Sequence, residues 1–177
     1  MDLEPAHPAD EWLASWRPIS LRPADSGLTQ KLRRAMDERV LELALIADEQ
    51  RRRYWSTHHL HRGEDRRNRP RFGCRIRARK RIFAIEWFRY VPRGPGKLAY
   101  TDYFRRGRGP RYELDRFVQA PAWELTLIDA IETALVPVRL ELAMIERIHR
   151  MLDASGQDGG TAAVKAKEFA HAPTLMG

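Results

Sequence analysis

Two long segments with helical periodicity constrain the fold of this chain most strongly. Residues 31–53 contain neither glycine nor proline and are rich in strong helix formers. In residues 123–152 apolar side chains again recur at intervals of three and four. Each segment has a single apolar stripe that must be covered, so we expect the two helices to pack together as an antiparallel pair. Pro137 lies inside the second segment, where we expect a kink.

The residues between these helices follow the period of β-strands. Over residues 71–79, apolar residues alternate with glycine and arginine, which is typical of a strand with one apolar and one cationic face. Residues 82–91 are rich in β-branched and aromatic side chains, and a third short strand is expected over residues 98–105. The predicted fold class is α+β: two long antiparallel helices flank a small three-stranded antiparallel β-meander, and the termini are disordered.

The composition predicts one domain with irregular ends. Residues 1–27 are proline-rich and predict an irregular lead-in, whereas residues 28–153 form a single α-β-β-β-α nucleic-acid-binding domain. Residues 154–177 are mostly small and polar and predict a flexible C-terminal tail. Within the domain, residues 56–70 are polar and basic without any period, so we expect a flexible loop there.

Positive charge is concentrated in the middle of the chain. Residues 51–116 contain 21 Lys or Arg and 6 Asp or Glu, whereas the remainder contains 11 bases and 18 acids. Such segregation is typical of a surface that binds phosphates, although a solubilising face would also explain part of it. The net charge of +8 makes nucleic acid the first candidate partner.

The arginines of the first strand provide the most regular candidate site. Alternate residues of a strand lie roughly 7 Å apart on one face, which approximates the spacing of phosphates along a nucleic-acid strand. Further cations come from the neighbouring turns and from an Arg-Gly segment at residues 105–111. Glycine-rich turns are also ordinary connectors. The candidate nucleic-acid-binding residues are Arg75, Arg77, Arg79, Lys80, Arg81, Arg93, Lys97, Arg105, Arg106, Arg108 and Arg111.

Aromatic residues near these cations offer a second means of binding, through stacking on unpaired bases. Because aromatic residues of strands usually pack in the core, we expect most to be buried and one or two at most to be exposed. Glu86 is expected to pair with an arginine of a neighbouring strand. The candidate stacking residues are Trp87, Phe88, Tyr90, Tyr100, Tyr103 and Phe104.

The sequence gives little support for catalysis. His59, Leu60 and His61 resemble the His-hydrophobe-His triplet of metal-dependent nicking endonucleases, but their polar flanks predict a loop instead of a buried strand. Nearby arginines would repel a metal cation, and no nucleotide-binding glycine-rich loop or catalytic triad is present. We therefore predict no enzyme activity, no metal and no cofactor, with a metal-dependent nicking enzyme as the alternative.

The sequence also predicts where the protein acts. Cys74 is the only cysteine, so no intramolecular disulfide and no thiolate zinc site can form, which favours a reducing cytoplasm. No export signal is seen at the N-terminus, and the longest apolar stretch, residues 41–47, is too short to span a membrane. We expect a cytoplasmic protein without membrane contact.

Several short strings resemble the MobI-type mobilisation proteins of integrative conjugative elements over residues 32–153. They are Phe83-Ala-Ile-Glu-Trp-Phe-Arg, residues 106–112, Trp123-Glu124, Glu132 and the helix at residues 139–150. The resemblance implies a non-enzymatic accessory protein that recognises the origin of transfer and helps a separate relaxase, with no catalytic residues to assign.

Protein partners would then use acidic helical faces, for example at Glu132, Glu141 and Glu146, and the helices would also allow a homodimer. A general RNA-binding or DNA-binding module remains an alternative from charge and pattern alone.

Overall fold

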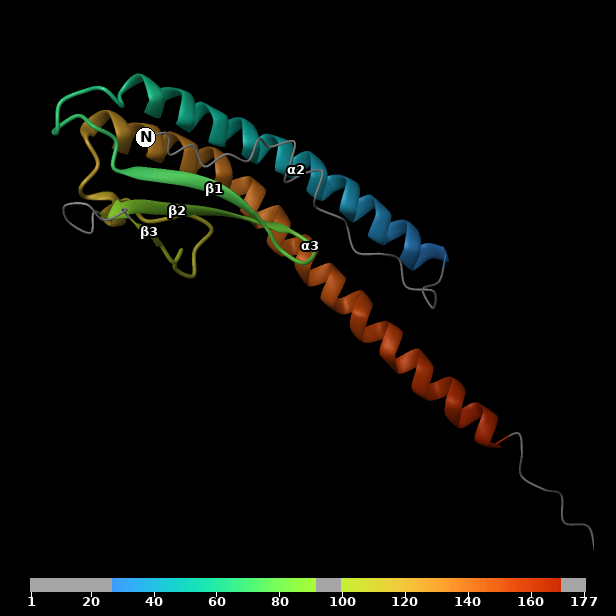
Figure 1. Cartoon of the computed structure of the whole chain (residues 1–177). Coiled ribbons are helices and arrows are strands. Elements are labelled where there is room, and N and C mark those ends of the chain that lie inside the picture. The colour runs from blue at the N-terminus through green and yellow to red at the C-terminus, as the bar shows by residue number, and fades with distance from the viewer. Residues whose placement is uncertain (1–26, 92–99, 170–177) are drawn as a thin grey trace, which may run out of the picture.

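The computed structural model describes residues 27–91 and 100–169, with side chains up to residue 154. Their two long helices and three-stranded antiparallel sheet confirm the predicted α+β class (Figure 1). In chain order the elements are α2 (Gly27–Leu60), β1 (Phe72–Ala78), β2 (Phe83–Val91), β3 (Tyr100–Tyr103), the 3-10 helix η1 (Leu114–Phe117) and α3 (Ala122–Phe169). Residues 1–26 of the predicted lead-in and residues 170–177 of the predicted tail lie outside the described residues.

Helix α2 is longer than predicted. The sequence suggested an end near Arg53 and a loop from residue 56, but α2 continues to Leu60, so the predicted loop is wrong over its first five residues. The reason is burial: Tyr54 and Trp55 contact the sheet, and His58 is buried beside their rings. The indole of Trp55 donates a hydrogen bond of 2.8 Å to the carbonyl of Cys74, which fixes this last part of α2 to β1.

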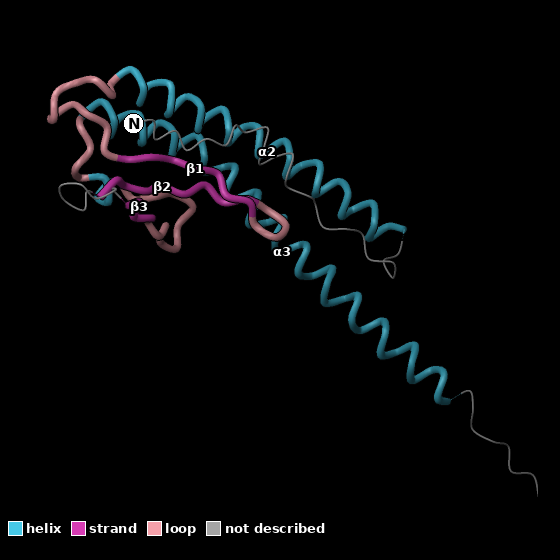
Figure 2. The backbone as a smooth tube through the Cα atoms, in the orientation of Figure 1, coloured by secondary structure: helices cyan, strands magenta, loops and turns pink. Residues whose placement is uncertain are grey.

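Helix α3 also runs past its predicted end at residue 152 and continues to Phe169. Residues 162–168 are mostly alanine, lysine and glutamate, which favour helix, and no proline interrupts them. Figures 1 and 2 show α3 projecting beyond the rest of the described structure. Pro137 lies inside α3 at an exposed position, with helix on both sides.

The helices form one layer and the sheet forms a second layer against them (Figures 1 and 2). Helices α2 and α3 lie side by side and run in opposite directions, as predicted. The strand order is β1-β2-β3 and both pairings are antiparallel, so the predicted meander is confirmed. Cys74 lies opposite Trp87, and Phe88 lies opposite Tyr103.

The core lies between these layers. One face of the sheet, including Phe72, Phe83 and Trp87, packs on the apolar stripes of the helices. Glu124 of α3 is buried within this core and accepts hydrogen bonds from the Tyr54 hydroxyl at 2.6 Å and from the backbone N–H of Phe72 at 3.0 Å. Burial raises the pKa of the Glu124 carboxyl. The carboxyl group therefore joins α2, α3 and the start of β1. The sheet face that points away from this core carries the candidate site.

Candidate nucleic-acid interface

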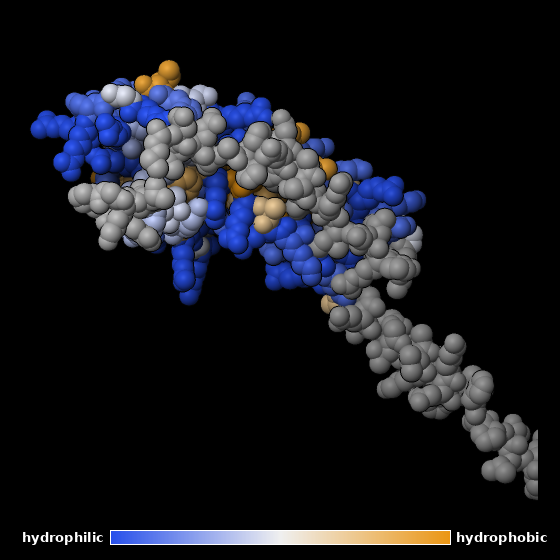
Figure 3. Space-filling view, viewed as in Figure 1, coloured by the Kyte–Doolittle hydropathy of each residue, from blue (hydrophilic) through white to orange (hydrophobic). Residues whose placement is uncertain are grey.

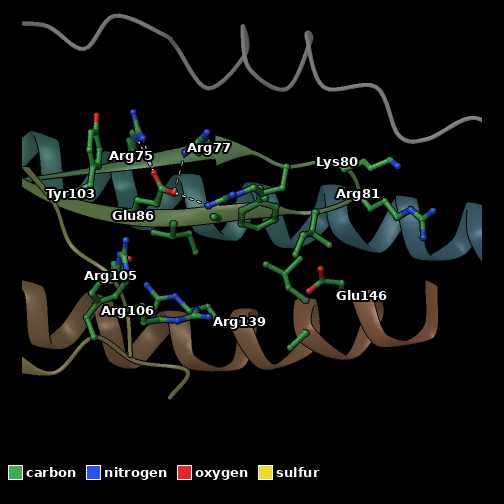
Figure 4. A pocket seen from close by; sticks show the side chains of 18 of the residues that line it. Arg75, Arg77, Lys80, Arg81, Glu86, Tyr103, Arg105, Arg106, Arg139 and Glu146 are labelled. Carbon is green, nitrogen blue, oxygen red and sulfur yellow. Dashed lines mark hydrogen bonds and ion pairs between the residues drawn. The ribbon is translucent and has the colours of Figure 1, made fainter. Parts of the chain in front are cut away.

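The outer face of β1 and β2 gathers three predicted arginines around one carboxylate. Glu86 lies directly opposite Arg75 in the sheet register, and its oxygens are 2.7 Å from Arg75, 3.1 Å from Arg79 and 3.8 Å from Arg77 (Figure 4). The predicted pairing of Glu86 with an arginine of a neighbouring strand is confirmed. The Glu86 side chain is only 14% exposed, whereas those of Arg77 and Arg79 are 55% and 51% exposed. The guanidinium groups thus converge on an internal anion and keep an excess of positive charge at the surface.

This cationic face continues into a cleft of about 1120 Å³ between the β1-β2 hairpin, the segment after β3, and α3 (Figure 4). Nine basic residues line the cleft: Arg75, Arg77, Arg79, Lys80, Arg81, Arg105, Arg106, Arg139 and Arg150. Three acidic residues, Glu86, Glu146 and Asp153, also line it. We call this site the cationic cleft. Seven of the eleven candidate residues from the sequence meet there.

The cleft exists because β3 covers only part of β2. Strand β3 pairs with residues 88–91, and the backbone N–H of Phe104 donates to the Trp87 carbonyl at 2.9 Å. Within the described residues no strand pairs with β2 beyond this point on that side. Helix α3 runs along the uncovered edge instead, as Figure 4 shows, and supplies the opposite wall.

Arg139 anchors that wall through a buried ion pair that the sequence interpretation missed. Its guanidinium group contacts Glu132 at 2.7 Å, and it donates to the carbonyl of Pro110 at 3.1 Å. Glu132 also accepts from the Trp87 indole and from the Tyr112 backbone N–H, both at 2.7 Å. The expectation that Glu132 belongs to an exposed acidic face is wrong, because its side chain is fully buried. The sequence signal for this pair is that Glu132 and Arg139, which carry opposite charges seven residues apart, lie on the apolar stripe of the helix.

Arg106 lies in the same electrostatic environment as Arg139. Burial, followed by the positive charge of Arg139, lowers the pKa of Arg106. Within the described residues, Arg105 and Arg106 form no ion pair with an acidic side chain, and both line the cationic cleft. This end of the cleft therefore concentrates positive charge that an anionic ligand would neutralise.

The hairpin tip closes the other end of the cleft. Arg81 lies 2.5 Å from one carboxylate oxygen of Asp153, and Arg33 of α2 lies 3.0 Å from the other. One acidic residue near the middle of α3 therefore holds the turn of the β1-β2 hairpin and the N-terminal part of α2. The geometry of the cleft depends on all three elements.

Two of the six candidate aromatic residues are exposed, as predicted, but only two are fully buried, and Tyr90 and Phe104 are half-buried. Trp87 and Phe88 are buried, whereas Tyr100 and Tyr103 are 42% and 39% exposed. Only Tyr103 of these two lines the cleft. The guanidinium carbon of Arg75 lies 3.7 Å from the centre of the Tyr103 ring, which places a cation on an aromatic face (Figure 4).

The comparison with protein families bears on the part of the chain that builds this site. Residues 43–153 match the family model described as MobI protein. The chain belongs to the MobI protein family. The matched region includes the second half of α2, the sheet, and every residue that lines the cationic cleft. Membership makes this a mobilisation protein of conjugation and confirms the resemblance found in the sequence. No curated protein and no solved structure matches the chain.

The four other candidate residues of this MobI family member lie away from the cleft or outside the described residues. Arg93 and Lys97 belong to residues 92–99, which are not described. Arg108 is exposed but does not line the cleft. Arg111 is bound to α3 through Asp129 and through the hydroxyl of Thr133 at 3.4 Å. The role of these four residues in nucleic-acid binding stays a prediction.

The His-hydrophobe-His triplet lies at the end of α2, where the sequence suggested a loop. His59 is exposed on the helix, whereas His61 follows it, contacts Glu64 at 2.5 Å and stacks on Trp123 at 4.0 Å between ring centres. Among the described residues, no group of three His, Cys, Asp or Glu side chains is arranged to hold a metal ion.

Two further properties of this MobI family member follow from the described residues. Cys74 is buried, and burial raises the pKa of its thiol to about 12, so the thiol is unreactive at neutral pH. No helix in the described ranges combines the length and apolar character needed to cross a membrane.

Proposed function

We propose that this MobI family member is a non-enzymatic DNA-binding accessory protein of conjugative transfer. It recognises the origin of transfer through the cationic cleft and assists a separate relaxase in the cytoplasm. The observation that supports the proposal is the lining of the cleft, in which nine basic residues stand against three acidic ones.

The chemistry of the cleft suits phosphate groups. Arginine donates several hydrogen bonds in a planar array that matches phosphate oxygens, and these bonds are stronger where water is partly excluded. Arg77 and Arg79 keep about half of their side-chain surface exposed, so both can reach a bound backbone. At the other end, a phosphate between Arg105 and Arg106 would neutralise charge that no acidic side chain of the described residues balances.

The distribution of charge leaves surface for a protein partner. Outside residues 51–116 the chain has 18 acids and 11 bases, so most of its acidic residues lie outside the basic segment. Figure 3 shows mostly hydrophilic side chains on the described part of the face in view, with small and separate apolar patches. A relaxase would contact acidic residues outside the basic segment, for example near the half-buried Glu141 of α3, while DNA occupies the cleft.

A metal-dependent nicking enzyme is less well supported. His59 is exposed on α2, whereas His61 follows the helix and already contacts Glu64 and Trp123. His59 and His61 are therefore poorly placed to share one metal ion. Cleavage of supercoiled origin DNA with magnesium or manganese, lost in His59→Ala and His61→Ala, would favour the enzyme over our proposal.

The decisive measurement compares binding to a duplex that carries the origin of transfer with binding to a scrambled duplex of equal length, at two salt concentrations. We expect a preference for the origin that survives the higher salt, because base contacts are less sensitive to salt than phosphate contacts. Equal binding to both duplexes, or tighter binding to RNA of the same sequence, would leave only a general nucleic-acid-binding module.

The cleft itself is tested by removing two of its cations. Arg105→Ala combined with Arg106→Ala should reduce the slope of log affinity against log salt by up to about 1.8, since each phosphate contact contributes roughly 0.9. Arg34→Ala combined with Arg147→Ala is the matched control, because both residues are exposed on helices and neither lines the cleft. The same slope in both double variants would show that DNA binds elsewhere.

A further inference from the structure

Resting on the proposed function, we infer that the cationic cleft binds single-stranded DNA in preference to duplex DNA, with a base stacked at Tyr103. The inference concerns which form of DNA the cleft accepts. It follows from the position of Tyr103, from the Arg75 guanidinium that lies over the Tyr103 ring, and from the size and lining of the cleft.

Tyr103 is held at the rim of the cleft by the sheet. It is the last residue of β3 and lies opposite Phe88, so its side chain is on the same sheet face as Arg75 and Glu86. Its ring centre is 5.4 Å from that of Phe88, which is buried, and 3.7 Å from the Arg75 guanidinium carbon. The side chain is nevertheless 39% exposed. An aromatic residue is thus fixed in orientation while part of its surface stays open.

Stacking at Tyr103 requires a base whose flat face is accessible. In a duplex each base is stacked between its neighbours, and a protein in the groove reaches only the base edges. In a single strand the faces are open and stack on aromatic rings or on the guanidinium plane of arginine. The Arg75 guanidinium lies over one face of the Tyr103 ring, so a base can stack on the outer side of the guanidinium or on the exposed part of the ring.

The cleft has the two kinds of lining that a single strand requires, which are apolar surface for the bases and cations for the phosphates. Ile82 and Ala143 contribute accessible apolar surface, whereas Arg105, Arg106 and Arg150 are among its cations. A volume of about 1120 Å³ is close to the upper end of small-molecule pockets, roughly 1,000 Å³. The cleft therefore admits a few nucleotides, with bases over the apolar surface and Tyr103 and with phosphates on the arginines. A duplex would contact only the rim.

The sheet provides a matched control for Tyr103. Tyr100 belongs to the same strand and is 42% exposed, but it lies opposite Val91 and does not line the cleft. Residues three apart on a strand face opposite sides of the sheet. Tyr100→Ala therefore removes a similar exposed ring from β3 and leaves the contact between Tyr103 and Arg75 in place.

The experiment measures fluorescence anisotropy of labelled oligonucleotides with the full chain. Each separate strand of the origin and the duplex formed from both strands are titrated with the wild-type protein and with Tyr103→Ala, Tyr103→Phe and Tyr100→Ala. We expect at least about tenfold tighter binding to one separate strand than to the duplex. Tyr103→Ala should weaken single-strand binding by about 5- to 100-fold, while Tyr103→Phe and Tyr100→Ala stay within about twofold of wild type.

Two results would overturn the inference. One is tighter binding to the duplex than to either strand, and the other is an equal effect of Tyr103→Ala and Tyr100→Ala at unchanged helical content by circular dichroism. In either case the proposed function stands if Arg105→Ala with Arg106→Ala still weakens duplex binding. If no DNA binds, or if that double variant binds every DNA as the wild type does, the proposed function fails as well.

Discussion

At the scale of single residues, the buried pair of Glu132 and Arg139 is the point on which the cleft is built. The Glu132 carboxylate joins the sheet through Trp87, joins the Arg-Gly segment through Tyr112, and holds Arg139 at the cleft wall. Glu132→Gln removes the negative charge and leaves the Arg139 cation buried without its counter-ion. We expect the free energy of unfolding to fall by roughly 3 to 5 kcal/mol, measured by urea denaturation with tryptophan fluorescence.

The matched control for this prediction is the surface pair of Arg39 and Glu141, whose atoms lie 2.6 Å apart. The same substitution at this position, Glu141→Gln, should change the free energy of unfolding much less, because solvent screens an exposed pair and rehydrates the arginine. Losses of similar size in both variants would show that Glu132 does not compensate a buried charge.

The residue scale also shows what the sequence could predict about the site. The alternation of residues 71–79 placed Arg75, Arg77 and Arg79 on one face, and the structure brings them together around Glu86. Arg139 and Arg150 were not predicted as site residues. They belong to a helix whose periodicity shows which side is apolar, but periodicity does not show which strand that helix will meet.

At the scale of elements, the β1-β2 hairpin depends on a close approach at Gly73. A Cβ atom at this position would lie 2.3 Å from the ring of Phe88, the residue directly opposite it in the register. Phe88 cannot turn away freely, because it is buried against Tyr90 and Tyr103. We expect Gly73→Ala to lower the free energy of unfolding by about 1 to 3 kcal/mol in urea denaturation.

Gly63 provides the comparison for this substitution. A Cβ atom there would have no neighbour within 4 Å, so Gly63→Ala should leave stability almost unchanged. Equal stability of Gly73→Ala and wild type would show that the hairpin tolerates a shift of Phe88. Because Phe88 packs on Tyr103, such a shift would also move the Tyr103 ring.

The elements themselves were predicted more reliably than their ends. The period of two identified β1, β-branched and aromatic content identified β2, and the period of three and four identified both helices. The ends of α2 and α3 were wrong because residues 56–60 and 154–169 have no strong apolar period of their own. In α2 the additional turns are stabilised by the contact of Trp55 with β1 and by the burial of His58, which are tertiary effects.

At the scale of the whole molecule, two buried histidines make stability depend on pH. Burial lowers the pKa of His58 from 6.5 to about 4, and burial also lowers the pKa of His149. At a pH between the lowered pKa of each folded-state histidine and 6.5, the unfolded chain binds more protons than the folded protein. The free energy of unfolding should therefore fall as the pH is lowered from about 6.5 towards 4, and urea denaturation at pH 7 and pH 5 measures this change.

A substitution tests the assignment to His58. His58→Gln removes the titrating group, so the loss of stability between pH 7 and pH 5 should be smaller in this variant than in the wild type. His59→Gln is the control, because His59 is exposed at the neighbouring position of α2. An identical pH dependence in the wild type and His58→Gln would assign the effect to other groups.

The walls of the cationic cleft come from two distant parts of the chain, the hairpin at residues 75–86 and α3 from residue 139 onward. A ribosome therefore releases most of the positive charge well before it releases the helix that turns this charge into a cleft. We expect a growing chain to pass through a stage in which its basic segment attracts polyanions before α3 completes the cleft. Charge and shape arise at different moments of synthesis, and only the completed α3 brings them together.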